Sequence, residues 1–355
     1  MTLPDTMYGI QLTGHGGPDM LQARHDIPVP TPRPGEVLIR VAAAGVNNTD
    51  INTRLAWYSK GDGESEDASW SGQALQFPRI QGADVCGRIA AVGEGVSAER
   101  VGERVGERVL IEPCIREGGG QLLDQPWYFG SECDGGFAEY TTVAARHAYR
   151  IDSQLSDVEL ASFPCSYSTA ENMLTRARLA SGERVLVTGA SGGVGSAAVQ
   201  LAKARGAYVI AITSAEKAEI LRELGADEVV LRDDALRDVI EADSIDVVVD
   251  LVAGEQWPQY LEVLCRKGRY AVSGAIAGPI VELDVRTLYL KDLNLLGCTV
   301  IEPEVFGNLV SHIEQGRIAP LVAASLPLEQ IGEAQALFQE KRHVGKIVLE
   351  VGVSG

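Results

Sequence analysis

Residues 185–214 decide the fold of this chain, and they read Val-Leu-Val-Thr-Gly-Ala-Ser-Gly-Gly-Val-Gly-Ser-Ala-Ala-Val-Gln-Leu-Ala-Lys-Ala-Arg-Gly-Ala-Tyr-Val-Ile-Ala-Ile-Thr-Ser. The β-branched run Val185–Thr188 is typical of a buried strand, and a glycine-dense turn and an Ala-rich helical stretch follow it. A second apolar run, Tyr208–Ile212, predicts another strand. This strand–helix–strand order predicts a βαβ unit, which binds the pyrophosphate of a dinucleotide at the N-terminus of its helix.

The turn between the two strands carries the small residues that such a site needs. Ala190, Gly192 and Gly195 stand at the three small positions of the G-x-G-x-x-G pattern. Gly192 lets the backbone approach the phosphates, and Gly195 lets the helix lie close to the strand. A tight turn without a ligand is the alternative, which the flanking strands disfavour. The predicted contact residues of this turn are Ala190, Ser191, Gly192, Gly193, Val194 and Gly195.

The end of the second strand indicates which dinucleotide binds. NAD sites usually place an acidic residue there to accept hydrogen bonds from the ribose, but this strand ends in Thr213-Ser214, with Lys217 close behind. Hydroxyl and ammonium groups suit a 2′-phosphate, and Arg232, after a predicted third strand, adds positive charge. The alternative is that Lys217 and Arg232 are solvated surface charges. We therefore expect NADPH as the cofactor.

Composition narrows the class of protein further. The 355 residues are enough for two domains, and a net charge of −18 argues against a nucleic-acid or anionic-membrane partner. The N-terminal residues show no signal-peptide pattern, and no run reaches the roughly 18 apolar residues of a membrane span, so we expect a cytoplasmic protein. The six cysteines include no C-x-x-C pair and are expected to be free thiols.

The remaining pattern predicts two kinds of domain. The N-terminal part is strand-rich and turn-rich, whereas strands alternate with helices after residue 185, as in a doubly wound parallel sheet. The final strand, Lys346–Val351, is predicted to return to the first domain. Polar, Gly-rich composition predicts long loops at Ser59–Gln73 and Arg116–Gly136, and one helix is expected over Asp157–Ala180. The other predicted strands are Val37–Ala43, Val85–Val92, Arg108–Ile111, Glu228–Leu231, Ile245–Leu251, Arg269–Ser273 and Asn294–Thr299.

Five ordered segments resemble the medium-chain dehydrogenase/reductase superfamily, in its zinc-independent, quinone oxidoreductase-like branch. They are Gly45-Val46-Asn47 with Asp50, Arg54 and Tyr58; Gly82-Ala83-Asp84 through Gly87 to Val92-Gly93-Glu94-Gly95-Val96; Gly135-Gly136-Phe137-Ala138-Glu139-Tyr140; residues 187–195; and Gly345-Lys346-Ile347-Val348-Leu349.

The resemblance implies an α/β protein with two domains. A GroES-like, β-rich catalytic domain is expected over 1–150 and is completed by 300–355, and a Rossmann domain for the cofactor is expected over 151–299. It also implies cofactor contacts from Thr169, Leu251, Gly274 and Lys346; for Thr169 the alternative is a hydroxyl on the helix surface. We expect a homodimer.

The same resemblance argues against zinc. The ligand positions of the zinc alcohol dehydrogenases of this superfamily hold Asn47, Ala83 and Cys165, and only the last is a ligand type. The lobe that binds a structural zinc needs four closely spaced cysteines, whereas residues 112–134 contain two, Cys114 and Cys133. We expect neither metal.

Without zinc, hydrogen bonds must stabilise the charge that develops during hydride transfer. Asn47 and Tyr58 are the predicted donors to a substrate carbonyl; their alternatives are a turn-stabilising amide and a partly buried aromatic. Asp84 is predicted as a proton donor if burial keeps it protonated, or else as the partner of Arg54 or Arg88 in a buried ion pair.

These residues predict an NADPH-dependent enzyme that reduces quinones or α,β-unsaturated carbonyls. Two alternatives stay open: an atypical zinc-dependent alcohol dehydrogenase, and a non-catalytic NADPH-binding sensor.

Overall fold

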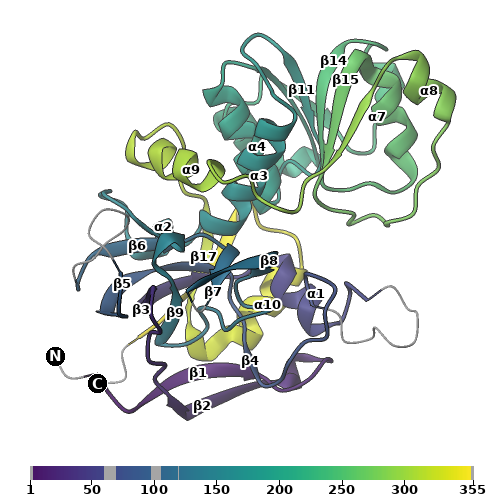
Figure 1. Cartoon of the computed structure of the whole chain (residues 1–355). Helices are drawn as coiled ribbons and strands as arrows, with labels where there is room; N and C mark the ends of the chain where they lie inside the picture. The colour runs from purple at the N-terminus through teal and green to yellow at the C-terminus, as the bar shows by residue number, and fades with distance from the viewer. Residues whose placement is uncertain (1–2, 60–68, 97–104, 119, 353–355) are drawn as a thin grey trace. The chain divides into compact units, whose positions relative to one another are not determined.

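The computed structural model describes residues 3–59, 69–96, 105–118 and 120–352. The chain divides into two compact units, Met1–Cys165 with Pro320–Gly355, and Ser166–Ala319 (Figure 1). We call them the terminal unit and the central unit. The domain boundaries predicted at residues 151 and 300 lie somewhat earlier in the chain than the boundaries of these units.

The central unit is built on a parallel sheet of six strands in the order β13-β12-β11-β14-β15-β16. The strands are β11 (Arg184–Val187), β12 (Tyr208–Thr213), β13 (Glu228–Leu231), β14 (Ile245–Asp250), β15 (Leu264–Val272) and β16 (Asn294–Gly297). The parallel sheet predicted from the alternation of strands and helices is confirmed. The strand order reverses between β11 and β14, which is where ligands of such sheets bind, beyond the carboxyl ends of the strands.

Helices cover this sheet because its strands are apolar on both faces. Helix α4 (Gly193–Ala204) packs on β11 and β12, and α7 (Trp257–Val263) packs on β15. The turn before α4 requires glycine, since a Cβ on Gly195 would lie 2.3 Å from the carbonyl oxygen of Gly189. The other helices of four or more residues that lie wholly in this unit are α5 (Ala218–Glu223), α6 (Leu236–Val239), α8 (Val285–Leu290) and α9 (Val305–Glu314).

The terminal unit is rich in strands. Its larger sheet runs β10-β6-β5-β3-β18-β17, with β9 also paired to β3, and a smaller sheet runs β2-β1-β4. The central strand β3 carries Val37, Leu38 and Ile39, which are fully buried in the core of this unit. The larger sheet consists of β3 (Glu36–Gly45), β5 (Asp84–Val92), β6 (Arg108–Ile111), β9 (Tyr140–Ala144), β10 (Ala148–Arg150), β17 (Val322–Pro327) and β18 (Lys346–Glu350). The smaller sheet consists of β1 (Thr6–Leu12), β2 (Leu21–Pro28) and β4 (Arg79–Ile80).

The last strand joins the two ends of the chain. β18 pairs antiparallel with β3, placing Val348 opposite Gly45, and α10 (Ile331–Gln339) packs beside it. The prediction that the C-terminal strand returns to the first domain is confirmed.

Two predictions about local structure were wrong. Arg116–Gly136 is not one long loop, because most of a hairpin lies within it, formed by β7 (Cys114–Gly118) and β8 (Gln121–Tyr128). The single helix predicted over Asp157–Ala180 is two, α2 (Asp157–Leu160) and α3 (Pro164–Arg176). Pro164 separates them because proline lacks an N–H donor and disfavours helical backbone in the residue before it. Most of the predicted loop Ser59–Gln73 lies outside the described residues.

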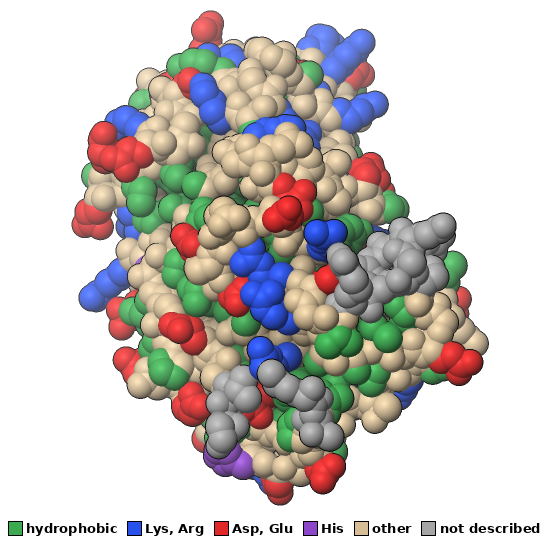
Figure 2. Space-filling model, turned by 90° about the vertical axis from the view of Figure 1, so that its left-hand side faces the viewer, with side chains coloured by type: hydrophobic (Ala, Val, Ile, Leu, Met, Phe, Trp, Pro, Cys, Tyr) green, Lys and Arg blue, Asp and Glu red, His purple; other side chains and the backbone are tan. Residues whose placement is uncertain are grey.

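The surface carries charges of both signs, and acidic and basic side chains both occur on the face seen in Figure 2. Within the described residues, no helix is long and apolar enough to cross a bilayer. All six cysteines are free thiols, as predicted.

Candidate active site and cofactor edge

The site in the terminal unit begins where β3 ends. Asn47 caps the short helix α1 (Asn48–Arg54) in a reciprocal capping box with Asp50, whose Oδ2 accepts a hydrogen bond from the Asn47 backbone N–H at 2.8 Å. Gly45, the last residue of β3, allows a close approach here, because a Cβ on it would lie 2.6 Å from Oδ2 of Asp84. The backbone therefore brings the side chains of Asn47 and Asp84 together.

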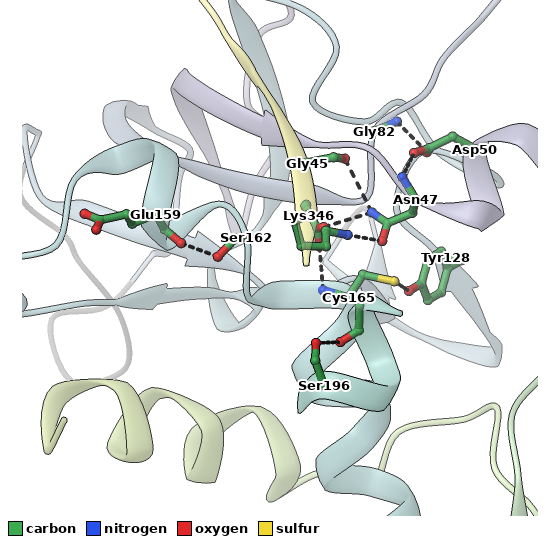
Figure 3. A network of polar contacts seen from close by, with 12 residues as sticks. Gly45, Asn47, Asp50, Gly82, Tyr128, Glu159, Ser162, Cys165, Ser196 and Lys346 are labelled. Atoms are coloured by element: carbon green, nitrogen blue, oxygen red, sulfur yellow. Dashed lines mark hydrogen bonds and ion pairs between the residues drawn. The ribbon is translucent and has the colours of Figure 1, made fainter. Parts of the chain in front are cut away.

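Three buried side chains form one polar network at this point (Figure 3). Asn47 Nδ2 donates to Asp84 Oδ2 at 2.8 Å, and Lys346 Nζ lies 2.8 Å from the same oxygen. Lys346 Nζ also donates to Asn47 Oδ1. Asp84 is fully buried and Lys346 is 2% exposed, so the ammonium and the carboxylate neutralise each other away from solvent. The partner of Asp84 is thus Lys346, not Arg54 or Arg88 as considered from sequence.

The other carboxylate oxygen of Asp84 holds the start of α3. Oδ1 accepts a hydrogen bond from the Cys165 backbone N–H at 2.5 Å. The Cys165 Sγ in turn accepts a hydrogen bond from Tyr128 Oη at 2.9 Å. The ring of Trp70 packs on the ring of Tyr128, with 4.9 Å between the ring centroids. Burial, together with the nearby Asp84, raises the pKa of Cys165 to about 12. Cys165 is therefore a neutral thiol at physiological pH.

Asp50 is a site group that the sequence analysis did not assign a catalytic role. Its carboxyl is buried, and this burial raises its pKa from 3.8 to about 7, while the Asn47 N–H bond opposes the shift. Gly82 N–H approaches its Oδ1 at 3.3 Å. The spacing Asn47-x-x-Asp50 indicated a capping box, but only burial makes this carboxyl titrate near neutrality.

Tyr58 follows α1 and lies apart from the direct hydrogen bonds of the network. Its Oη donates to Thr49 Oγ1 at 3.2 Å, and its ring meets that of Trp57 edge to face. Burial raises the pKa of Tyr58, and Cys165 and Asp50 contribute to the rise. The structure thus joins Asn47 to Asp84 directly and leaves Tyr58 with a hydroxyl partner.

In the central unit, the residues predicted to bind a 2′-phosphate gather at the ends of β12 and β13. Arg232 N–H donates to the carbonyl of Thr213 at 2.8 Å, and Ser214 precedes the short 3-10 helix η3 (Ala215–Lys217). Burial lowers the pKa of Lys217, and the positive charge of Arg232 lowers it further. The buried Thr213 Oγ1 makes no hydrogen bond in the structure. Two cations and an unsatisfied hydroxyl fit an anionic ligand group.

The other predicted cofactor residues lie in different places. Ala190, Ser191, Gly192, Gly193, Val194 and Gly195 form the turn and the first helical turn of α4. Leu251 and Gly274 follow β14 and β15 and touch, since a Cβ on Gly274 would lie 2.9 Å from the Leu251 carbonyl oxygen. Thr169 is half-buried on α3. Lys346 lies in the terminal unit, with its ammonium bound to Asp84 and Asn47.

Comparisons with known proteins identify the family. The model of the zinc-binding dehydrogenases matches residues 193–315, and that of the GroES-like domain of alcohol dehydrogenases matches residues 33–153. Quinone oxidoreductase of Lama guanicoe is 30% identical to this chain, in a match that covers 97% of this chain and 97% of the length of the relative. The chain belongs to the medium-chain dehydrogenase/reductase superfamily. It is an oxidoreductase of a superfamily that binds a nicotinamide cofactor, with the predicted pairing of a GroES-like and a Rossmann-like fold.

Other members of the superfamily are similar along most of their length. Acryloyl-coenzyme A reductase of Metallosphaera sedula is 31% identical over 90% of this chain and 93% of its own. A crystal structure from Sinorhizobium meliloti 1021, described provisionally as an alcohol dehydrogenase, superposes with a TM-score of 0.90. It is 46% identical over 99% of this chain and 98% of its own.

Catalytic zinc, which occurs in part of the medium-chain dehydrogenase/reductase superfamily, does not fit the donors of this chain. The three relevant positions offer the Asn47 amide, the Ala83 methyl and the Cys165 thiol, so only one of the three side chains is a zinc ligand type. The Lys346 ammonium binds the side-chain oxygens of Asn47 and Asp84, which are the oxygen atoms that could otherwise ligate a metal here. Among the described residues, no group of three or more His, Cys, Asp or Glu side chains is placed to hold a metal.

Proposed function

We propose that this medium-chain dehydrogenase/reductase reduces quinones or α,β-unsaturated carbonyls with NADPH and without zinc. The observation that carries the proposal is the buried network of Lys346, Asp84 and Asn47, in which Asn47 stands at one of the three positions that hold metal ligands in related zinc enzymes. An ammonium that is already paired with a carboxylate leaves this site near neutrality, with no Lewis acid.

The chemistry of the substrate must suit such a site. Oxidation of a saturated alcohol passes through an alkoxide-like oxygen that is far too basic to form at neutral pH unless a metal stabilises it or a base takes the hydroxyl proton. Adding hydride to an enone or quinone places the charge on an enolate or hydroquinone oxygen, which is much less basic. Neutral hydrogen-bond donors are sufficient for that charge. The bound nicotinamide supplies the hydride.

The geometry favours Tyr58 over Asn47 as the donor to the substrate oxygen. One N–H of Asn47 is committed to Asp84, and its amide also approaches the Gly45 carbonyl oxygen at 3.4 Å. The hydroxyl of Tyr58 makes a 3.2 Å hydrogen bond to another hydroxyl, which can rotate and accept a different donor. In this proposal Tyr58 donates the proton to the substrate oxygen. Asn47, Asp84 and Lys346 stabilise the surrounding structure through their buried network.

NADPH is favoured by the residues that follow β12 and β13. Lys217 and Arg232 follow these strands and lie close enough for their positive charges to interact, and the Arg232 backbone N–H binds the carbonyl of Thr213, at the strand end where NAD sites carry an acid. The turn over residues 190–195 would hold the pyrophosphate at the N-terminus of α4. The names of two relatives, a quinone oxidoreductase and an acryloyl-coenzyme A reductase, agree with reduction of this substrate class.

The proposal is tested by measuring NADPH oxidation by the purified protein with a panel of quinones and enones, beside NADP⁺ reduction with ethanol and benzyl alcohol. We expect turnover with at least one enone or quinone and little with either alcohol, before and after treatment with a chelator. Faster oxidation of an alcohol, lost on chelation together with one zinc ion per chain, would establish the zinc-dependent alternative. Tight binding of NADPH without turnover of any compound would favour a sensor.

We further propose that the protein is a homodimer formed through the central unit. The open edge strand β16 and the segment before it expose a cluster of large apolar side chains, which a second copy would cover. These are Ile276, Ile280, Val285, Tyr289, Leu290 and Leu295.

A further inference from the structure

The central unit contains a buried carboxylate, Asp250, to which the proposed chemistry assigns no role. It ends β14 and is fully buried. Its Oδ1 accepts hydrogen bonds from Thr188 Oγ1 at 2.5 Å and from Val252 N–H at 2.9 Å, and its Oδ2 accepts one from Tyr270 Oη at 2.5 Å. Ala253 N–H lies 3.2 Å from both oxygens. One side chain thus links residues at the ends of β11 and β14, a residue of β15 and the loop that follows β14.

The loop held by Asp250 is strained. Ala253 has φ 54° and ψ −136°, which an L-residue with a side chain rarely adopts. Such a conformation persists only where the surrounding contacts enforce it, and Asp250 accepts from both N–H groups, Val252 and Ala253, that lead into it. Thr188 adds a further constraint because its hydroxyl oxygen accepts from Leu251 N–H at 3.0 Å.

This loop, residues 251–254, lies at the reversal of strand order, beside the glycine turn. A Cβ on Gly189 would lie 3.1 Å from the side chain of Val252, and Leu251 contacts Gly274 on the far side. The residues predicted to bind the 2′-phosphate lie at the ends of β12 and β13. The glycine turn over residues 190–195, which is predicted to bind the pyrophosphate, follows β11. The loop after β14 is therefore on the opposite side of the turn from the adenosine end, where the nicotinamide half of a dinucleotide extends.

We infer that Asp250 is a positioning residue for the nicotinamide half of the cofactor, which it serves by holding the strained loop 251–254 in shape. The inference rests on the proposed cofactor and adds to it a residue that does not itself touch the ligand. A carboxylate is needed because five donor contacts converge on its two oxygens, and an amide would turn an N–H₂ group toward one set of these donors.

The test measures binding of two ligands by the full-length protein. One is NADPH and the other is 2′-phospho-ADP-ribose, which lacks the nicotinamide. The variants are Asp250→Asn and Thr188→Val, with Thr188→Ser to restore the hydroxyl. Leu261→Ala, which removes a buried core side chain of α7, controls for a general loss of stability, measured as the melting temperature.

We expect Asp250→Asn and Thr188→Val to weaken NADPH binding about tenfold while 2′-phospho-ADP-ribose binding changes less than twofold. Thr188→Ser should recover most of the affinity for NADPH, and Leu261→Ala should lower the melting temperature without changing either affinity. Equal affinities for NADPH in the wild type and in both variants would overturn the inference. A loss of affinity of the same size for NADPH and for 2′-phospho-ADP-ribose would also overturn it. A wild-type protein that binds no nicotinamide dinucleotide would instead overturn the proposed function, before any variant is compared.

Discussion

The ammonium of Lys346 lies 2.8 Å from the carboxylate of Asp84, with both side chains almost completely buried. Lys346 begins the last strand of the chain and Asp84 begins β5, and the pairing of both strands with β3 brings the two residues together. Removing either partner of this ion pair should destabilise the protein, because the charge of the other would remain buried without a compensating charge.

Lys346→Met should therefore strongly destabilise the terminal unit. Removing one partner of a buried ion pair typically costs about 3–5 kcal/mol, because the remaining charge stays buried. Urea unfolding of the variant and the wild type measures the loss. The control is Lys203→Met, which breaks the 2.6 Å pair with Asp227 at the surface and should cost at most about 1 kcal/mol. Equal losses in the two variants would contradict the buried ion pair.

Lys217→Ala should reduce the preference for NADPH over NADH. A charged contact to the 2′-phosphate contributes roughly 1.5–3 kcal/mol, or about tenfold to a hundredfold in affinity. Fluorescence titration with both cofactors measures the preference. Lys203→Ala, at the opposite end of α4 from the glycine turn, removes the same charge and should leave the preference unchanged. The prediction is wrong if the wild type binds NADH as tightly as NADPH.

Tyr58→Phe should lower kcat by on the order of 10²-fold and leave the affinity for NADPH nearly unchanged. The hydroxyl is needed only when charge develops on the substrate oxygen, and loss of one such donor has an effect of this size. Steady-state kinetics with the best enone or quinone, together with a cofactor titration, separates the two quantities. Tyr208→Phe, at an exposed tyrosine of the central unit that lies outside the proposed dimer surface, serves as the control. Full activity of the Tyr58 variant would show that this ring serves only in packing and that solvent supplies the proton.

Asp50 should make the stability of the protein fall as the pH rises through neutrality. Its pKa is raised by burial from 3.8 to about 7, so the folded state holds the proton more tightly than the unfolded chain. The resulting stabilisation is complete below about pH 4 and is lost as the pH rises through 7. Between pH 5 and pH 8 the loss should be roughly 2–3 kcal/mol.

The measurement for Asp50 is urea unfolding at both pH values for the wild type and for Asp50→Asn, which resembles the protonated form. Other groups titrate equally in both proteins, so the difference between their pH dependences belongs to Asp50. Identical pH dependences would show that Asp50 is ionised throughout this range.

Ile280→Glu should dissociate the proposed dimer. A carboxylate in the exposed apolar cluster of the central unit would have to lose its hydration when a second copy covers it. Light scattering should give twice the chain mass of 37.9 kDa for the wild type and the single mass for the variant. Leu122→Glu, an exposed leucine of β8 in the terminal unit, should leave the mass unchanged. A monomeric wild type would contradict the homodimer.

Local sequence predicted most of the sheet of the central unit. Most of its strands are short apolar runs bounded by glycine or polar residues, although β15 also includes Arg266, Lys267 and Gly268. The turn before α4 has glycine where the backbone leaves no room for a Cβ. The hairpin formed by β7 and β8 was missed because β7 has only five residues and the residues of β8 are mostly exposed, in an order that lacks the apolar alternation that signals a strand. The break at Pro164 was visible in the sequence, but the helical pattern on both sides of it obscured it.

The sequence by itself determined the family, the parallel sheet, the glycine turn and the residues at the three metal positions, because all of these depend on neighbours in the chain or on residue type. The tertiary structure decided that Lys346 and Asn47, and neither Arg54 nor Arg88, are the partners of Asp84. It also decided that Asp50 is buried deeply enough to titrate near neutrality and that Asp250 holds a strained loop. These facts arise from contacts between residues far apart in the chain and from the loss of solvent around them, and no local pattern records either.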